Sequence, residues 1–306
     1  MIQTSTGLVG NSFKLGYRFQ RYWDTSMAIA FFSAEVGTGL FLVSFYFDLL
    51  SGMILGLAIT GTLKPYFHLA HMGVPDRSWR AILRPDRSWI SRGAISIGLL
   101  IGFGALHIIN RSFGLEATLG LPAAAGQAIA YLAVAGALVV MCYQGMAMSD
   151  SEAFTLWASP LVPVASFCYA LTAGVLATLA VGWGVLSEGQ RATLSTVALT
   201  MLLIDLAVVL GILLHARGKS KGGAFSVELL VRGEFAASFR NQVVILGLVL
   251  PVALLAVAGS VRLVELFALL AMLIGFFFFR TLMFKAAVFE PITHDLAGSI
   301  GLPSAR

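Results

Sequence analysis

Long apolar stretches separated by short polar connections dominate the pattern of this 306-residue chain. A membrane-spanning helix needs about 20 mostly apolar residues, because its backbone must satisfy its own hydrogen bonds in a water-free core. Eight stretches meet this requirement, at approximately 25–47, 49–69, 89–110, 125–148, 162–186, 193–215, 242–259 and 262–284. The pattern predicts an all-α polytopic membrane protein, built as a bundle of eight transmembrane helices.

Three regions follow from this pattern: a polar and aromatic N-terminal arm (1–24), the eight-helix transmembrane domain (25–284) and a C-terminal tail (285–306). The arm lacks the early apolar run of a cleavable signal peptide, so we expect it to be retained. The longest internal connection, 216–241, alternates apolar and charged residues and predicts a short helix at the membrane interface. Charged residues make up only 11% of the chain, against about 25% in soluble domains, which excludes an ordinary soluble enzyme.

The basic residues are divided unevenly between the two faces of the predicted bundle. With eight helices, both termini and the even-numbered connections share one face, which holds 17 of the 20 Lys and Arg residues. These are Lys14, Arg18, Arg21, Lys64, Arg77, Arg80, Arg84, Arg87, Arg92, Arg217, Lys219, Lys221, Arg232, Arg240, Arg280, Lys285 and Arg306. By the positive-inside rule we expect this face, with both termini, to be cytoplasmic. The net charge of +5 then reports orientation, and no nucleic-acid partner is expected.

Two carboxylates fall deep inside predicted membrane helices. Glu35 lies near the middle of the first helix, and Asp205 lies similarly deep in the sixth. Charges at this depth are expensive, so each group must be protonated, paired or facing an internal water cavity. Two roles remain open for both residues: a proton relay, or a polar contact that holds helices together.

The histidines and cysteines indicate neither a haem nor a metal site. A haem held by two histidines needs both at one depth on facing helices, and His71 with His215 supplies one such pair with no second pair. We therefore expect no haem. Cys142 and Cys168 occur within predicted helices at unrelated spacing, as buried inert thiols do, so no metal site is expected.

One polar segment interrupts the apolar pattern at residues 66–93, "YFHLAHMGVPDRSWRAILRPDRSWISRG". It ends one helix with an imidazole, turns at Gly73 and Pro75, and starts the next helix with Ser, Trp and Arg. These groups suit a half-wet pocket for the carbonyls of a quinone, where a histidine can donate or accept a proton. The other interpretation is that the arginines only fix topology and the tryptophans belong to an aromatic belt.

The same segment resembles the NrfD/PsrC/DmsC family, the membrane subunits of complex iron–sulfur molybdoenzymes and related respiratory complexes. The family pattern is roughly His-Leu-Gly-x-Pro-x-Arg-Ala-Trp followed by Ser-Trp-x-Ser-Arg, and this chain has "HMGVPDRSWRAIL" and "RSWISRG". Further similar segments follow in order: "EVGTGLFLVS", "LWASPLVPVASFCYALTAG", "LLVRGEFAASFRNQVVILGLVLP" and "LIGFFFFRTLM". One departure is Gly93, where many members have Glu. Any proton-handling role of that carboxylate is then absent or has moved, with Glu35 and Asp150 as candidates.

The resemblance implies a subunit without a redox cofactor of its own, which binds menaquinone or ubiquinone. It implies a ferredoxin-like iron–sulfur subunit and a molybdopterin or other redox catalytic subunit as partners. The residues that match quinone-site positions are His71, Arg77, Ser91, Arg92 and, by a looser alignment, Tyr143. The arginines of the same segment, Arg80, Arg84 and Arg87, are expected to dock an acidic partner surface.

The family context places the chain in the cytoplasmic membrane of a bacterium, and the charge distribution puts its partners on the cytoplasmic face. We expect a membrane anchor that carries no catalytic residue and exchanges electrons between quinone and an iron–sulfur partner. The alternative is a secondary transporter or proton-translocating module that uses Glu35 and Asp205. The prolines cluster near predicted helix ends, which argues against a transporter with broken helices.

Overall fold

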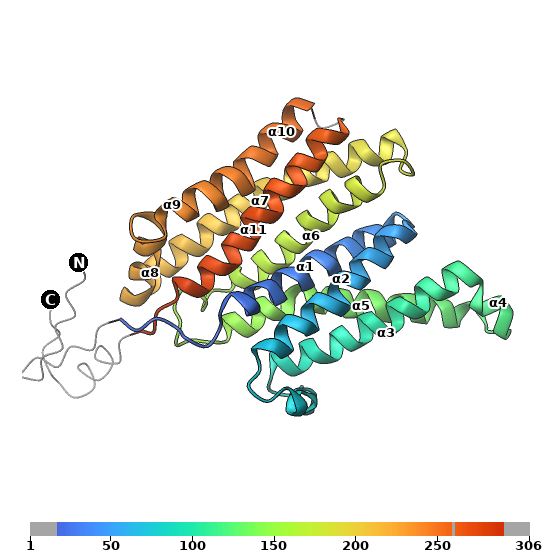
Figure 1. The fold of residues 1–306 in the computed structure, drawn as a ribbon, viewed down its shortest axis with the longest axis horizontal. Helices are drawn as coiled ribbons and strands as arrows, with labels where there is room; N and C mark the ends of the chain where they lie inside the picture. The colour runs from blue at the N-terminus through green and yellow to red at the C-terminus, as the bar shows by residue number, and fades with distance from the viewer. Residues whose placement is uncertain (1–16, 259–260, 291–306) are drawn as a thin grey trace, which may run out of the picture.

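A computed structural model describes residues 17–258 and 261–290 of the chain (Figure 1). Most of the predicted N-terminal arm, with Lys14, and most of the C-terminal tail, with Arg306, lie outside the described residues. The described part is helical apart from its connections, and it contains no β-strand. Two isolated antiparallel bridges, Phe19 with Val288 and Phe154 with Phe289, join segments that are far apart in the sequence.

Eight long helical segments make up the described bundle, and each overlaps one predicted stretch. They are α1 (Thr25–Tyr46), α2 (Leu50–His71), α3 (Trp89–Phe113), α5 (Ala123–Ser149), α6 (Leu161–Val181), α7 (Glu188–Lys219), the continuous run of α9 (Ala236–Ser238), η2 (Phe239–Val249) and α10 (Leu250–Ala258), and α11 (Arg262–Lys285). Three shorter helices occupy connections: η1 (Pro75–Leu83), α4 (Leu115–Leu119) and α8 (Lys221–Val231). The helix predicted within 216–241 is thus confirmed as α8.

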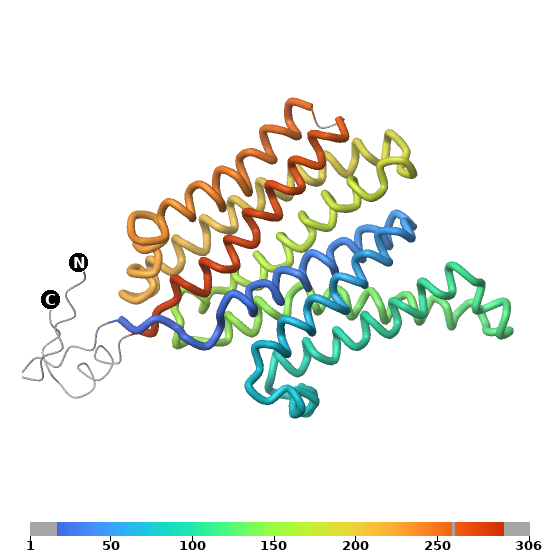
Figure 2. The backbone as a smooth tube through the Cα atoms, in the orientation of Figure 1, coloured from blue at the N-terminus to red at the C-terminus, as the bar shows by residue number. Residues whose placement is uncertain are grey.

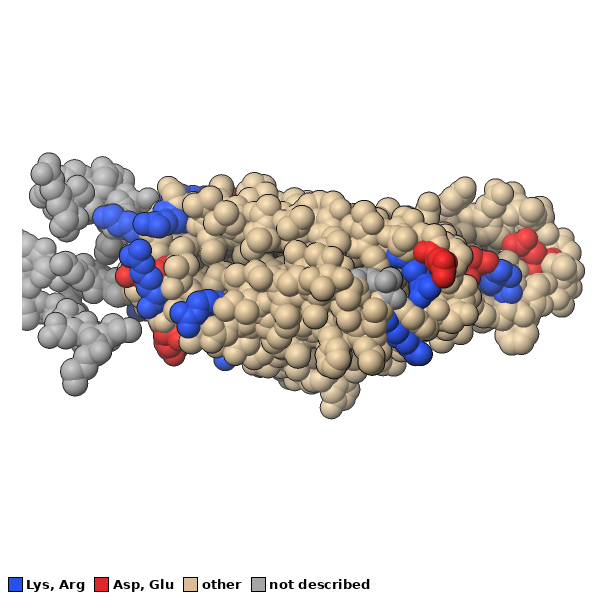
Figure 3. All heavy atoms as spheres, turned by 90° about the horizontal axis from the view of Figure 1, so that it is seen from above, with Lys and Arg blue, Asp and Glu red and all other residues tan. Residues whose placement is uncertain are grey.

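Seven of the long segments are apolar and long enough to cross a membrane, so an all-α multi-pass membrane protein is confirmed. The segment outside this group is α2, which has 22 residues but carries Lys64, Pro65 and two histidines. The space-filling view agrees with the membrane assignment, since charged side chains gather at the two ends of the visible face and leave its middle uncharged (Figure 3).

Helices α1 and α6 occupy the centre of the bundle, with α3 and α5 on one side and α7, α10 and α11 on the other (Figure 1). Small residues allow α1 and α6 to approach closely. A Cβ atom added at Gly39 of α1 would overlap the backbone carbonyl of Ala170 of α6, and one added at Gly174 would overlap Gly39. Close packing through glycine is a usual way for helices to associate in lipid, where burial of apolar surface provides no driving force between them.

Both described ends of the chain lie at the same end of the bundle as α8, α9 and the α5–α6 connection (Figure 2). The even-numbered connections therefore share one face, as predicted. Two of the 17 basic residues assigned to that face, Lys64 and Arg280, lie instead inside the bundle, with 2% and 0% of their surface exposed. Their inclusion as surface charges was wrong, because each stands near the end of an apolar run but points into the core.

The seventh predicted stretch differs from an ordinary helix. Its first half, η2, is an eleven-residue π-helix, and Pro251 follows just after the change to α10. The expectation that prolines lie near helix ends is therefore wrong for Pro251, which stands well inside the segment Ala236–Ala258. Proline has no N–H for the preceding turn, and a π-helical stretch is another known break in α-helical regularity.

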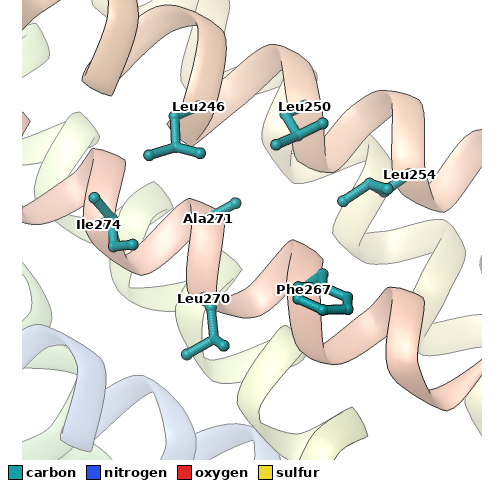
Figure 4. A pocket seen from close by; sticks show the side chains of 7 residues that line it. All are labelled: Leu246, Leu250, Leu254, Phe267, Leu270, Ala271 and Ile274. Carbon is teal, nitrogen blue, oxygen red and sulfur yellow. The ribbon is translucent and has the colours of Figure 1, made fainter.

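An apolar groove of about 420 Å³ lies between this segment and α11 (Figure 4). Gly247 and Gly275 bring the two helices together at one point, because a Cβ on either would overlap the other's Cα. The groove is lined only by apolar side chains: Leu246, Leu250, Leu254, Phe267, Leu270, Ala271 and Ile274. It offers no group that orients a polar ligand, so the candidate site lies elsewhere.

Candidate functional site

A buried ion pair joins α1 to α11 in the core. Nε of Arg280 donates to Oε2 of Glu35 at 2.9 Å, and Nη2 donates to Oε1 of Glu35 and, at 2.7 Å, to the hydroxyl of Ser166 on α6. Both charged side chains have 0% exposure. The sequence required Glu35 to be protonated, paired or facing a water cavity, and the structure shows that it is paired. A two-point contact of this kind is the strongest arrangement that a guanidinium and a carboxylate form.

A second buried cation, Lys64 of α2, lies beside this pair. Its Nζ donates to Oε1 of Gln144 at 3.1 Å, and Gln144 donates in turn to the carbonyl of Phe31 at 3.2 Å. The ammonium also stands over two aromatic rings, 4.6 Å from the centre of Phe31 and 5.6 Å from that of Tyr143. The burial of both cations was not predicted from the sequence. A signal was available for Arg280, whose neighbours three and four residues away (276, 277, 283 and 284) are all apolar, but not for Lys64, which has Thr60 and His68 at this spacing.

Asp205 of α7 has different surroundings from Glu35. Its side chain is fully buried, and its Oδ2 lies 2.6 Å from the hydroxyl of Thr172 on α6. Its Oδ1 has no hydrogen-bond partner among the described residues, and no described cation lies within ion-pair distance of the carboxyl. The two carboxylates predicted as a relay thus belong to separate groups of contacts in the bundle.

Ser91 and Arg92 fix the α2–α3 connection against the start of α3. The hydroxyl of Ser91 donates to the carbonyl of Ala81 in η1. The guanidinium of Arg92 donates to the carbonyls of Pro85 at 2.8 Å and Asp86 at 3.2 Å, and it stacks on Trp89 at 4.3 Å. Their described hydrogen bonds therefore hold the loop in place.

Tyr143 of α5 packs against the position where the sequence departs from the family pattern. A Cβ atom at Gly93 would overlap the ring of Tyr143. The ring is 5% exposed and fills the space into which a longer side chain would extend. Gly93 is therefore matched to Tyr143, and a glutamate at this position would require the ring to move. Asp150, the other candidate for the displaced role, is an exposed residue at the end of α5.

His71 ends α2 beside the start of α1. Its Nδ1 lies 3.2 Å from Oδ1 of Asp24, the residue that caps α1. Burial alone would raise the pKa of Asp24, but hydrogen bonds from Ser26 and the Met27 N–H, together with His71, hold this pKa below its usual value. The Asp24 carboxylate favours a proton on Nδ1 of His71, which leaves Nε2 for a ligand.

An aromatic cavity of about 240 Å³ lies at the same end of the bundle. Tyr22 and Trp23, the residues just before Asp24, form one wall, and Trp157 stacks on Trp23 with ring centres 5.0 Å apart. The remaining lining residues are Gln20, Ala147, Ser151 and Phe154. The cavity is therefore mostly aromatic and apolar, with a few polar groups. Asp24 follows the lining residue Trp23 directly, but the cavity lining includes neither His71 nor any other residue that the resemblance assigns to the quinone site.

The arginines of the α2–α3 connection are exposed at this end. Asp86 contacts Arg84 at 3.4 Å and Arg87 at 3.2 Å, whereas Arg77 and Arg80 form no ion pair with a described carboxylate. Arg77 is therefore exposed, whereas His71 and Arg92 are half-buried and Ser91 and Tyr143 are buried.

No protein-family model matches this chain, and a comparison with curated proteins finds no match.

Proposed function

We propose that this chain is the quinone-reactive membrane subunit of a multi-subunit respiratory oxidoreductase of the NrfD/PsrC/DmsC type. The observation that carries the proposal is the aromatic cavity whose lining residue Trp23 directly precedes Asp24, the partner of His71, at the bundle end where the family-like segment folds. Small-molecule sites are mostly apolar and contain a few oriented polar groups, and a quinone ring fits this description. The cavity residues Trp23 and Trp157 would hold the ring, and His71 would bind an oxygen through Nε2.

A bound menaquinone or ubiquinone supplies chemistry that couples two electrons to two protons. The part of the chain's own residues is to hold the ring, exclude water from it and hold a proton at His71. Ser91 and Arg92 act here by keeping the α2–α3 connection closed over the start of α3. Tyr143 lies one helical turn deeper along α5 than Ala147, which lines the cavity. Lys64 lies one helical turn deeper along α2 than His68.

The proposed partner is a ferredoxin-like iron–sulfur subunit that passes electrons to or from a molybdopterin or other redox catalytic subunit. Exposed arginines at the quinone end support it, because arginine forms two-point contacts with carboxylates of an acidic surface. Arg77 and Arg80 carry more of this docking than Arg84 and Arg87, which already contact Asp86.

We further propose that α2 is an eighth membrane span and that the protein lies in the bacterial cytoplasmic membrane with both termini in the cytoplasm. Length supports the eighth span, because 22 helical residues cover about 33 Å. The surface arginines of η1 and the basic residues around α8 support the orientation. At the C-terminus, a fused reporter that works only in the cytoplasm should be active, and one that works only outside the cytoplasm should be inactive. The opposite result would contradict the orientation.

Quinone binding is tested directly by tryptophan fluorescence of the full chain in lipid nanodiscs, because Trp23 and Trp157 line the cavity. Titration with a menaquinone or ubiquinone analogue should quench the emission and saturate. His71→Ala should weaken binding about tenfold, the value of one hydrogen bond of about 1.4 kcal/mol. The matched control is His215→Ala, an exposed histidine on α7. Equal affinities for the two variants, or no saturation in the wild type, would contradict the proposal.

A proton-translocating module remains the second proposed function, because Asp205 is buried with no described cation within ion-pair distance, and Pro251 stands inside a membrane span next to a π-helical stretch. Broken helices at membrane depth are typical of transporters. Proteoliposomes carrying a pH-sensitive dye would report proton movement under an imposed potential. Movement that depends on Asp205 without quinone would favour this function over the first.

A further inference from the structure

The hydroxyl of Thr172 stands between two oxygen atoms that both require its hydrogen. Its Oγ1 lies 2.9 Å from the carbonyl oxygen of Cys168 and 2.6 Å from Oδ2 of Asp205. A hydroxyl carries one hydrogen, so Thr172 donates to one of these atoms at a time. The carbonyl four residues earlier is the usual acceptor for a threonine inside a helix. The short contact with Asp205 then needs a hydrogen that the carboxyl itself supplies.

The surroundings of Asp205 favour the same protonation state. The carboxyl is fully buried in a membrane-spanning helix, and no described Lys, Arg or His lies within ion-pair distance of it. An ionised carboxylate here would have one hydrogen bond and no counter-charge, which is a costly state inside a membrane. Glu35 differs at this point, since Arg280 balances its charge and hydrogen-bonds both of its oxygens.

We propose that Asp205 is a proton-binding site that is occupied at neutral pH, with the proton shared between its carboxyl and Thr172. The site takes up one proton from water when the carboxylate forms the acid, and nothing is oxidised or reduced. It lies between α6 and α7, apart from the His71 end of the bundle, and it does not depend on the identity of a quinone or a partner.

A second buried polar side chain, Tyr169, lies near the site on α6. It lies three residues before Thr172, on the same helix face, and its buried hydroxyl has no hydrogen-bond partner among the described residues. Oδ1 of Asp205 is the other open hydrogen-bonding atom.

The other titratable groups around Asp205 provide no counter-charge. Cys168 and Tyr169 face it from α6, and Arg280 of α11 interacts with Tyr169 and Glu35. The segment of η2 and α10 that packs against α7 has no titratable residue between 241 and 258. The 2.6 Å separation of the two oxygens also favours a proton over a metal cation, which keeps each of its oxygen ligands at 2.0 Å or more and so spreads them further apart.

Infrared spectroscopy of the full chain in nanodiscs tests the protonation directly. At neutral pH the wild type should show a carbonyl stretch of a protonated carboxylic acid, which shifts in heavy water. Asp205→Asn should lose this band, and Glu35→Gln, the matched amide substitution at a buried carboxyl, should keep it. Thr172→Val should shift the band without removing it, because the acid stays and its hydrogen bond is lost.

Each other outcome decides against the proposal. Persistence of the band in Asp205→Asn would place the proton on another carboxyl, such as the buried Glu265, and its loss in Glu35→Gln alone would place the proton on Glu35. Absence of the band in the folded wild type would show that Asp205 is ionised. Loss of the band on addition of sodium would show a metal-cation site. If Asp205→Asn does not fold, the Thr172→Val shift remains as the test, and an unshifted band would overturn the assignment.

Discussion

Removal of one partner from the Glu35–Arg280 pair should destabilise the protein strongly. Glu35→Met leaves the Arg280 guanidinium with 0% exposure, and its remaining hydrogen-bond partners are the hydroxyl of Ser166 and the weakly accepting sulfur of Met148. Two charge-assisted hydrogen bonds are lost, each worth about 1.5–3 kcal/mol, and a buried charge is left without its partner. Breaking a buried ion pair from one side typically costs about 3–5 kcal/mol, so we expect a loss in this range.

The double variant Glu35→Met/Arg280→Met should recover much of this loss. Replacing both charges by apolar groups of similar volume is often neutral, because it also removes the cost of desolvating them. Equilibrium unfolding of the wild type, both single variants and the double variant in one detergent gives the coupling energy. Single variants within about 0.5 kcal/mol of the wild type, or strictly additive losses, would refute the assignment of a coupled buried pair.

Two further predictions concern packing and the end of the bundle opposite the termini. Gly39→Ala should cost about 1–3 kcal/mol of stability, because its Cβ would overlap the carbonyl of Ala170. Gly102→Ala is the control, since a Cβ there has nothing within 4 Å, and it should leave the melting temperature unchanged or raised. Equal effects of the two substitutions would contradict the α1–α6 contact. The hydrogen bond from Arg111 holds the pKa of Asp48 in the folded protein below its ordinary value of about 3.9. The ionised carboxylate therefore stabilises the fold at pH values above about 3.9, and this stabilisation is lost as the pH falls through the pKa of the folded protein. The wild type should therefore lose more stability than Asp48→Asn between pH 6 and pH 3 in parallel thermal melts, and identical pH profiles would exclude the contact.

Apolar run length predicted the helices well, because a span must be about 20 residues long and the connections here are too short to hide another. The helix ends were less certain: α7 begins at Glu188 and the α9–η2–α10 run at Ala236, several residues before the predicted starts. Polar caps such as Ser187, whose hydroxyl accepts from the Gln190 N–H, extend a helix beyond its apolar part. The π-helical stretch η2 has no distinct sequence signal.

The contacts of the candidate site were less predictable than the fold. Depth alone identified Glu35 and Asp205 as unusual, but their partners come from helices far away in the sequence. Arg280 and Lys64 were taken as surface charges because position along a run says nothing about which face of the helix is buried. Gly93 was recognised as a departure, and only the structure shows that the ring of Tyr143 occupies the space.

Isolation of the protein from its native membrane tests the central claim most directly. The chain would carry a C-terminal tag and be extracted in mild detergent, and mass spectrometry would identify what co-purifies in stoichiometric amount. We predict an iron–sulfur subunit together with a redox catalytic subunit, and loss of both from a variant with Arg77 and Arg80 changed to Glu. A protein that purifies intact and alone, without a redox partner, and that moves protons across a liposome membrane would contradict the account and favour a transporter.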